Sequence, residues 1–328
     1  MAGSGGLCGI IGSHRRSCAA RGQSLEATPS AAWQQRRCGI AYDVSMPSFS
    51  RRAFVQAAAS LLPASQLALA WDKLSHANLG FQVYTVRNII DSDPAGVLKQ
   101  VHDIGYGNIE GTQAVVEKNW DAIQASGLKP VSIHLSMKPT DEQLADAKKK
   151  GFQFAVIPYV GVESRGGVDV MKKLAAQFNE AGKRAKDNGL TLCYHNHAFE
   201  FEPMNGTRPL DILMGETKPE YVQLEMDIFW VTVAGNDPVQ LLKKYSGRVP
   251  LLHLKDKEKG VPAKPQYNEN VPKDTFKEVG NGTINIPAVL KAASSAGVKQ
   301  YFVEQDQSPD PIASLRQSYQ YLSKHFST

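Results

Sequence analysis

Short apolar runs alternate with amphipathic stretches along most of this chain. The runs are four to eight residues long and rich in branched and aromatic side chains, which is typical of strands buried on both faces of a parallel sheet. The stretches between them have helical spacing, as in residues 168–187, where Leu174, Phe178, Ala181 and Ala185 share one face. The pattern predicts eight strands, at residues 79–86, 108–111, 129–134, 154–158, 190–197, 222–227, 249–253 and 300–304.

Each predicted strand is followed by a predicted helix. Strict alternation predicts a parallel α/β architecture, and eight units favour closure into a single-domain (β/α)8 TIM barrel over an open doubly wound sheet. No Gly-x-Gly-x-x-Gly or Walker pattern opens a helix, which weakens a nucleotide-binding interpretation. The helices are predicted at residues 94–104, 115–125, 141–150, 168–187, 209–215, 238–245, 286–296 and 312–326.

The front of the chain has the features of an export signal. Ser50-Arg51-Arg52-Ala53-Phe54-Val55 is a twin-arginine signature, followed by an uncharged stretch to residue 70 and by Ala68-Leu69-Ala70, a pattern that suits cleavage before Trp71. A buried helix beginning at an accidental arginine pair is the alternative, but Pro63 within the apolar run fits a signal better. We therefore expect a periplasmic or secreted protein that uses the twin-arginine route.

The segment before this signal has no apolar periodicity. Met46 stands five residues before Arg51, so we expect Met46 to be the true start of the protein. The predicted organisation is then a start-site artefact or disordered tail over residues 1–45, a signal peptide over 46–70, and one barrel domain over 71–328.

Charge supports the same division. The chain has 37 Lys and Arg and 32 Asp and Glu, and residues 71–328 hold 30 of each kind. The mature part is formally neutral, which gives no support for binding nucleic acid or an anionic membrane. Of the four cysteines, Cys193 alone follows residue 70, so no disulfide can form there and a buried thiol is expected.

Four successive predicted strands end in side chains that can bind metals. If the strands are parallel, these ends meet at the C-terminal face of a barrel, where such enzymes place their chemistry. Two imidazoles and two carboxylates suit Mn²⁺, Zn²⁺, Co²⁺ or Fe²⁺ better than Ca²⁺, which prefers oxygen ligands. Side chains two apart in a strand share a face, so each of three strands brings an in-phase neighbour. The predicted ligands of one divalent ion are His195, Asp227, His253 and Glu304, and the neighbours are His197, Glu225 and Asp306.

One long connection, residues 255–285, separates the seventh strand from its helix. It contains six lysines, three prolines and Gly280-Asn281-Gly282. Long loops in compact domains are usually lids or disordered, and a position on the catalytic face of a barrel favours a lid.

Several motifs resemble those of the sugar phosphate isomerase/epimerase family, which has a xylose isomerase-like TIM barrel. They occur in the family's order from about Leu79 to the C-terminus, so the resemblance covers nearly all of the mature part. The resemblance implies the fold but does not identify the substrate, because the family includes isomerases, epimerases, dehydratases and an endonuclease branch. The motifs are residues 79–87 (LGFQVYTVR), 194–201 (YHNHAFEF), 226–230 (MDIFW), 234–235 (AG), 253–256 (HLKD), 279–282 (VGNG) and 303–306 (VEQD).

The resemblance implies a divalent metal held by Glu, Asp, His and Glu from the last four strands. Asp227, His253 and Glu304 match the last three of these positions, while His195 stands where the family has its first glutamate. This departure matches a Tyr-His-Asn-His branch of the family. It leaves a metal site possible but removes one carboxylate of the epimerases' two-glutamate proton shuttle.

Such a site implies chemistry next to a carbonyl group. A divalent ion that chelates neighbouring carbonyl and hydroxyl oxygens stabilises the enediolate formed by deprotonation of the adjacent carbon. Proton return then gives isomerisation or epimerisation, and loss of a leaving group gives a lyase or dehydratase. The candidate residues are Glu304 as the base, His197, Glu110 and His134 for the second acid/base role, Lys255 for an anionic oxygen, and Trp230 and Tyr159 for stacking on a sugar ring.

Each of these assignments has a simpler alternative. Glu110 and His134 could merely line the barrel mouth, and Lys255 could be a solvated lysine of the lid. Trp230 and Tyr159 could pack in the aromatic core.

We expect an exported, metal-dependent isomerase or epimerase of a free or oxidised sugar, with a lyase on keto-sugars or keto-glycosides as a close alternative. An endonuclease would need a basic groove, which the neutral charge argues against. A non-catalytic carbohydrate-binding protein is the alternative of another class. The expected partner is a small-molecule carbohydrate, with no nucleic acid and, after signal removal, no membrane, and the sequence makes no prediction about oligomeric state.

Overall fold

The structure, a computed structural model, describes residues 74–326. The predicted tail over residues 1–45, the twin-arginine signal and the cleavage site before Trp71 lie outside these residues. The barrel strands are β1 (Leu79–Gln82), β2 (Asn108–Thr112), β3 (Lys129–His134), β4 (Phe154–Ile157), β5 (Thr191–His195), β6 (Val222–Asp227), β7 (Leu251–Leu254) and β10 (Gln300–Val303).

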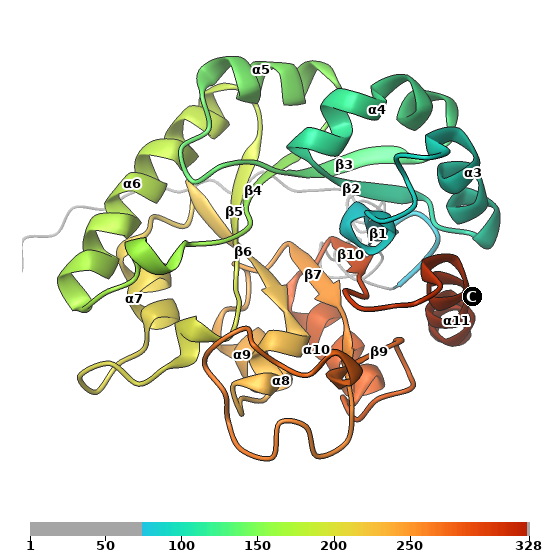
Figure 1. The fold of residues 1–328 in the computed structure, drawn as a ribbon. Helices are drawn as coiled ribbons and strands as arrows, with labels where there is room; N and C mark the ends of the chain where they lie inside the picture. The colour runs from blue at the N-terminus through green and yellow to red at the C-terminus, as the bar shows by residue number, and fades with distance from the viewer. Residues whose placement is uncertain (1–73, 327–328) are drawn as a thin grey trace, which may run out of the picture. The chain divides into compact units, whose positions relative to one another are not determined.

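These strands form a closed parallel barrel. Going round it, the order is β1, β10, β7, β6, β5, β4, β3 and β2, and every neighbouring pair is parallel (Figure 1). The predicted TIM barrel is therefore confirmed, and the open doubly wound alternative is wrong. All strands point their C-terminal ends to one face, where the predicted ligands stand.

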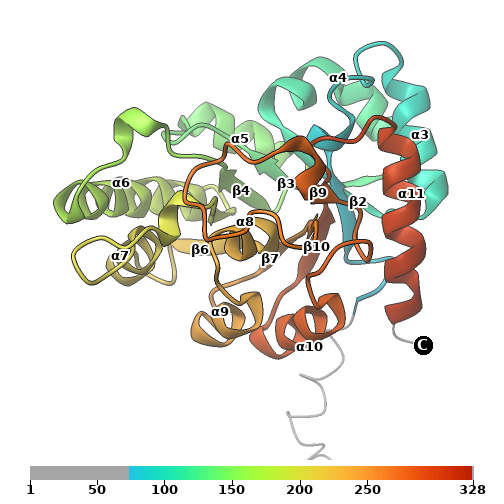
Figure 2. The ribbon, with the colours of Figure 1, turned by 60° about the horizontal axis from the view of Figure 1, so that its bottom comes forward.

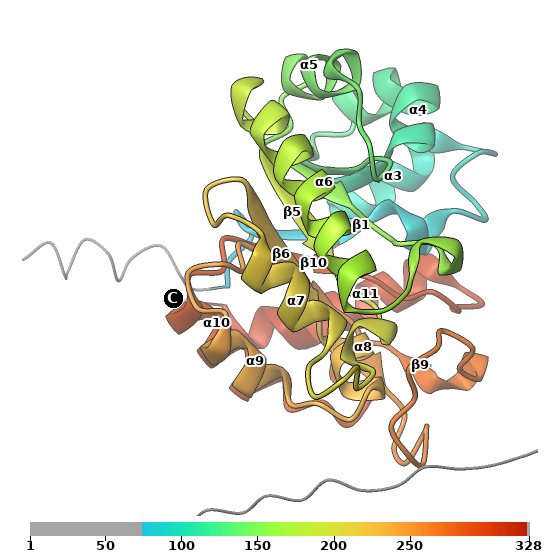
Figure 3. The same cartoon turned by 90° about the vertical axis from the view of Figure 1, so that its left-hand side faces the viewer.

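A ring of helices surrounds the barrel. Neighbouring helices pack against each other, as α6 and α7 do in Figure 3, and α11 packs against α3 beside the junction of β10 with β1 (Figure 2). Four helices begin with a proline in the first two positions behind an Asp or Asn side-chain cap, a sequence signal for a helix start. The helices are α3 (Pro94–Ile104), α4 (Gln113–Ala125), α5 (Asp141–Lys149), α6 (Val168–Asp187), α7 (Pro209–Glu216), α9 (Pro238–Lys244), α10 (Ile286–Ala296) and α11 (Pro311–Leu322).

Two short helices start directly at strand ends and differ from the predicted pattern. The first strand was predicted to reach Val86, but the side chain of Gln82 accepts the backbone N–H of Tyr84, and a 3-10 helix follows as η2 (Val83–Val86). Similarly, the carboxylate of Asp227 caps α8 (Ile228–Val233), which the sequence did not predict. In both places a buried polar side chain at the strand end caps the helix that follows.

The long connection after β7 is partly ordered by a single carboxylate. It includes an antiparallel pair, β8 (Asp256–Lys257) and β9 (Phe276–Lys277). Asp256 accepts hydrogen bonds from four backbone N–H groups, those of Lys257, Gly280, Gly282 and Ile284. The base of the predicted lid is therefore fixed to the barrel.

The lower part of the barrel interior is apolar. A small cluster separate from the main core fills it, and three of its members stand two residues before His195, His253 and Glu304 on the same strands. Polar side chains are thus confined to the mouth, and the expected burial of Cys193 is confirmed. Among residues 74–326, no helix is both long and apolar enough to span a membrane. The cluster consists of Val131, Phe154, Val156, Cys193, Leu251 and Phe302.

Candidate metal centre and active site

A cavity of about 430 Å³ opens at the C-terminal face of the barrel. It is large enough for a small ligand such as a monosaccharide. Seven of the predicted site residues line it, namely His134, Tyr159, His195, His197, Trp230, Lys255 and Glu304, together with Gln82, Tyr84, Thr112, Pro158, Glu269 and Asp306.

Strand register brings predicted ligands together beside this cavity. Asp227 lies opposite His253 in the β6–β7 pair. The ligand atoms of Asp227, His253 and Glu304, which we call the outer cluster, all lie within 4.8 Å of one another. His195 is adjacent, with its Nε2 atom 3.8 Å from Asp227 Oδ2. The four strand ends singled out in the sequence therefore converge.

The outer cluster has the chemistry of a divalent metal site. One carboxylate oxygen of Asp227, Oδ1, accepts the N–H groups of Phe229 and Trp230, which fixes the side chain. The other, Oδ2, is buried and accepts no hydrogen bond, although it forms an ion pair with Lys255 Nζ at 3.1 Å. An imidazole and two carboxylates are three ligands, and catalytic zinc sites commonly have three protein ligands with one open position. The residues present therefore fit a divalent ion.

Lys255 lies at this cluster rather than on a solvated lid. It is 2% exposed, and its Nζ atom is 3.1 Å from Asp227 Oδ2, 2.9 Å from Glu304 Oε2 and 3.2 Å from Asp306. Burial by itself would lower the pKa of Lys255, but Asp227, Asp306 and Glu304 outweigh it and hold that pKa well above its usual value. The side chain is therefore a fixed positive charge at the cavity wall.

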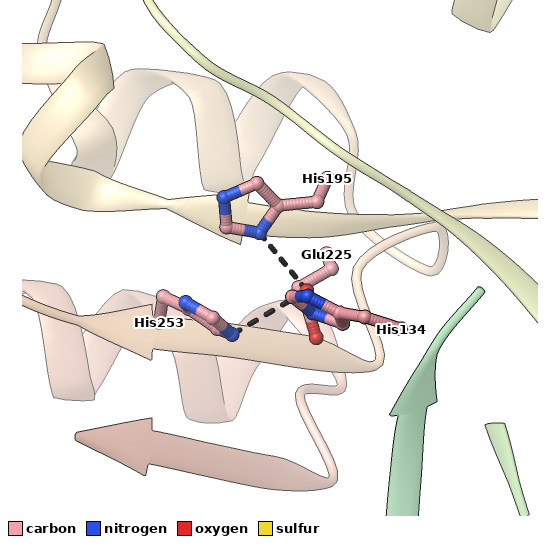
Figure 4. Close-up of side chains that lie close together, drawn as sticks. All are labelled: His134, His195, Glu225 and His253. Atoms are coloured by element: carbon pink, nitrogen blue, oxygen red, sulfur yellow. Dashed lines mark hydrogen bonds and ion pairs between the residues drawn. The ribbon is translucent and has the colours of Figure 1, made fainter. Parts of the chain in front are cut away.

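A second group of possible ligands lies beneath the first. We call His134, His195, Glu225 and His253 the inner cluster, and their ligand atoms also lie within 4.8 Å of one another (Figure 4). Glu225 Oε2 is 2.9 Å from His195 Nδ1, 3.1 Å from His134 Nε2 and 3.4 Å from His253 Nε2. Glu225 faces inward because it stands two residues before Asp227 on β6, opposite His195 of β5.

Glu110, predicted as an acid or base, lies in this deeper layer and does not line the cavity. It is 0% exposed, and its Oε1 atom is 2.5 Å from His253 Nε2 and accepts a hydrogen bond from Gln82. Burial opposes ionisation, but His134 and His253 hold the pKa of Glu110 well below its usual value. Glu225 differs, because burial and the neighbouring Glu110 raise its pKa to about 8.

His134 and His197, the two other predicted acid/base residues, line the cavity, and their pKa values are shifted in opposite directions. Burial would lower the pKa of His134, but Glu110 and Glu225 raise it to about 10. Burial and Lys255 lower the pKa of His197 to about 3, so its ring is neutral, and its Nδ1 atom has no hydrogen-bond partner. The backbone N–H of His197 is held by buried Glu200, whose pKa is raised to about 7 by burial.

The aromatic candidates occupy different depths. Trp230 is buried at 4% exposure, while Tyr159 is 38% exposed, and the ring of His197 lies 5.4 Å from the first and 5.0 Å from the second. Arg165 covers the Tyr159 ring at 4.9 Å and pairs with Glu269 of the long connection at 3.0 Å. Both aromatic side chains therefore line the cavity, and the pair formed by Arg165 and Glu269 joins two loops at its rim.

Asp306 and Glu225 lie at the site, although the sequence assigned neither of them a catalytic or metal-binding role. Asp306 lines the cavity, and burial raises its pKa to about 7 although Lys255 opposes the shift. Both residues were visible in the sequence as in-phase neighbours of predicted ligands, at a spacing of two. That spacing gave the face of the strand but not which side chain would reach the mouth.

The closed parallel barrel agrees with the result of a family comparison. Residues 147–325 match the family described as xylose isomerase-like TIM barrel, and the chain belongs to this family. The sequence-based family assignment is confirmed.

Relatives in the family have more than one activity. The chain is 32% identical over 143 residues to the inosose dehydratase of Bacillus cereus strain AH820, covering 42% of this chain and 47% of that protein. The chain thus spans about half the length of the curated relatives it matches first. A sugar phosphate isomerase/epimerase from Parabacteroides distasonis has a similar structure, with a TM-score of 0.64, 22% identity, and coverage of 76% of this chain and 94% of that one.

A third similar structure contains a metal. The IOLI protein, whose crystal structure has a bound zinc atom, aligns with a TM-score of 0.59 at 16% identity, over 76% of this chain and all of that one. At these identities the structural matches establish the shared fold alone.

Proposed function

We propose that this protein is a divalent-metal-dependent dehydratase of a keto-sugar or cyclic keto-polyol. One observation carries the choice among reactions that begin with the same proton abstraction. The cavity-lining carboxylates near the outer cluster, Glu304 and Asp306, come from the end of β10, and the end of β5, three strands further round the barrel, carries His195 and His197 instead. Epimerisation through two opposed carboxylates lacks its second carboxylate, whereas elimination can use acid and base groups on one face.

The proposed ligands are Asp227, His253 and Glu304, three of the four predicted from the sequence, and the fourth, His195, lies adjacent with its Nε2 atom 3.8 Å from Asp227 Oδ2. A divalent ion bound there supplies a Lewis acid for the substrate's carbonyl oxygen. The site residues would hold Zn²⁺, Mn²⁺, Co²⁺ or Fe²⁺, since they offer both nitrogen and oxygen ligands.

Side chains of the protein supply the base for the first step. The base removes the proton next to the carbonyl, and the electron pair of the broken C–H bond forms the enolate. Glu304 and Asp306 are the candidate bases. Within residues 74–326, the carboxylate of Asp306 contacts Lys255 alone, at 3.2 Å, and burial raises its pKa to about 7, whereas Glu304 Oε2 is 2.9 Å from both His253 and Lys255. We therefore favour Asp306 as the base, with Glu304 retained as a ligand.

Lys255 is suited to the developing negative charge. Its ammonium group lines the cavity, is fixed by three carboxylates and needs no reorganisation when an enolate oxygen forms nearby. When the enolate collapses to a carbonyl, the β-hydroxyl group leaves with its electron pair and takes a proton from the acid. The protonated Asp306 can return the proton it removed, so that water departs from the same face.

The cavity's aromatic and imidazole side chains orient the ring in this proposal. Trp230 provides an apolar surface at the base of the cavity, and Tyr159 provides one at the rim. His197, with its free Nδ1 atom, can bond a substrate hydroxyl. The match to proteins named inosose dehydratase supports a cyclic keto-polyol as the substrate.

The test is incubation of the zinc-loaded protein with inososes, keto-sugars and 3-keto-glycosides in D₂O. Dehydration is expected to give a product lighter by one water, recorded by mass spectrometry, with NMR locating any solvent deuterium beside the carbonyl. A product of unchanged carbon skeleton and mass, apart from deuterium, would instead establish an isomerase or epimerase. Affinity for sugar that survives chelation, with neither turnover nor exchange, would establish a non-catalytic binding protein.

We also propose that the chain is exported by the twin-arginine route. The sequence pattern around Arg51 and Arg52 supports this proposal, as does the predicted cleavage site. N-terminal sequencing of the exported protein should begin at Trp71. Replacement of both arginines by lysine should leave the chain in the cytoplasm, and export of that variant would contradict the assignment.

A further inference from the structure

We propose that the barrel holds a second divalent cation beneath the first, bound by the inner cluster of His134, His195, Glu225 and His253 (Figure 4). This inner site does not depend on the proposed reaction, because its ligands converge below the outer cluster where the substrate would bind. Its existence can therefore be decided without knowledge of the substrate.

Charge balance is the first argument. Five carboxylates surround the two clusters, and a buried carboxylate is stable only when a cation or strong donors compensate it. In residues 74–326, one Lys or Arg side chain, that of Lys255, lies within 4.0 Å of any of these carboxylates. With neutral imidazoles the net charge is then −4, and it becomes −5 when His253 bridges both ions as an imidazolate; two divalent cations offset four of these charges and one offsets two. The carboxylates are Glu110, Glu225, Asp227, Glu304 and Asp306.

Ligand geometry is the second argument. Metal–ligand bonds of about 2.0–2.2 Å in a tetrahedral site place neighbouring ligand atoms about 3.3–3.6 Å apart. The three imidazole nitrogens that face Glu225 Oε2 lie 2.9, 3.1 and 3.4 Å from it. The other oxygen, Oε1, is buried and has no hydrogen-bond partner. All four ligand atoms also lie within 4.8 Å of one another, so one ion can contact them together once the 2.5 Å contact between His253 Nε2 and Glu110 Oε1 opens.

The two clusters share one histidine but present different atoms of it. Nδ1 of His253 is 2.9 Å from Glu304 in the outer cluster, while Nε2 is 3.4 Å from Glu225 in the inner cluster. One imidazole can therefore hold both ions after losing its second ring proton. His195 likewise turns Nδ1 to the inner position, which leaves the outer ion three protein ligands and open positions for substrate.

This arrangement also accounts for the unusual residue at position 195. The family resemblance implies a glutamate there, and the chain has an imidazole instead. A carboxylate is present one layer deeper, at Glu225, directly opposite His195 in the β5–β6 register. The histidine is then a ligand of the inner ion, and the outer site is completed by Asp227, His253 and Glu304.

Metal stoichiometry tests the proposal. The full chain is stripped with chelator, dialysed against buffered micromolar Zn²⁺, and analysed for zinc per chain by mass spectrometry. We expect two ions in the wild type, one in Glu225→Gln and one in Asp227→Asn. Glu180→Gln, which changes an exposed carboxylate on α6, is the matched control and should keep two ions. Circular dichroism with Zn²⁺ present establishes that each variant is folded.

A measurement on the wild type keeps the test independent of how the variants fold. Anomalous diffraction at the zinc edge from crystals of the dialysed protein should show two peaks, one bonded to Glu225 Oε2 and one to Asp227 Oδ2. A single peak at the outer cluster, or one zinc per chain, overturns the inner site and means that protonated imidazoles balance the charge. Absence of dehydration with two zinc ions bound would count against the proposed function alone.

Discussion

Lys255 gives the sharpest test of how the mouth of the barrel is stabilised. Its ammonium group is almost inaccessible and contacts Asp227, Glu304 and Asp306 at 2.9–3.2 Å. Replacement by methionine keeps most of the side chain's volume and its apolar contact surface, but removes the charge. The three carboxylates then repel one another without the cation that compensates them when no metal is bound.

The expected cost follows from the burial of this group. Removing one partner of a buried ion pair typically costs about 3–5 kcal/mol, because the remaining charge stays out of water. In chelator we expect Lys255→Met to lose about this much free energy of unfolding. With a denaturant slope of about 3 kcal/mol per molar urea, the midpoint falls by about 1–1.7 M. Urea titrations followed by circular dichroism measure this shift.

Divalent metal should reverse the effect. Zn²⁺ replaces the missing positive charge, so the variant should gain more stability from Zn²⁺ than the wild type does and should bind it more tightly. Lys183→Met is the control, because Lys183 pairs with Asp187 at 2.6 Å on the exposed face of α6 and should show no measurable change. A loss below about 1 kcal/mol for Lys255→Met in chelator would refute the reasoning.

Three further predictions concern groups around the site. The pKa of Glu200 is about 7 in the folded protein against 4.5 in the unfolded chain, so the unfolded chain loses this proton first as the pH rises. The stability of the wild type should therefore fall relative to that of Glu200→Gln by up to about 3 kcal/mol between pH 4.5 and 7. Urea titrations that show a constant difference between the two proteins would contradict this. Asp256→Asn places an amide N–H₂ against backbone donors, so it should cost at least about 2 kcal/mol of unfolding free energy and speed tryptic cleavage within residues 257–277; unchanged digestion would oppose this role. Gly280→Ala should destabilise the same connection, because φ is +93° and the added Cβ would lie 2.3 Å from the ring of Tyr321; a melting temperature equal to that of the wild type would count against this.

Much of the fold could be predicted because local and global signals agree. Apolar runs marked all eight barrel strands, and the strand at 129–134 and the helix at 168–187 match their predicted bounds. The short helix α8 was missed because its sequence, residues 228–233, is an apolar continuation of the strand before it. Asp227 ends that strand by capping α8, but the sequence indicated only a metal ligand at this position.

The sequence predicted which side chains point into the barrel, but not how deep in the barrel each one lies. A spacing of two shows which side chains share the interior of a strand, and it correctly brought Asp227, His253 and Glu304 together. The same spacing places Lys255 in phase with His253, but it could not show that three carboxylates would surround its ammonium group. Nor could it rank Glu225 against Asp227, because both point inward and only the stagger of β6 against β5 and β7 sets their heights.

The closure of the barrel by β10 sets the order in which the protein can mature on the ribosome. This strand pairs with β1 and with β7, so the sheet stays open until nearly the whole barrel sequence has been synthesised. Glu304 follows β10 directly, and a nascent chain stalled before it would have the imidazoles and Asp227 but an incomplete outer cluster. Metal binding by all three ligands of that cluster therefore requires the last strand of the barrel to be in place.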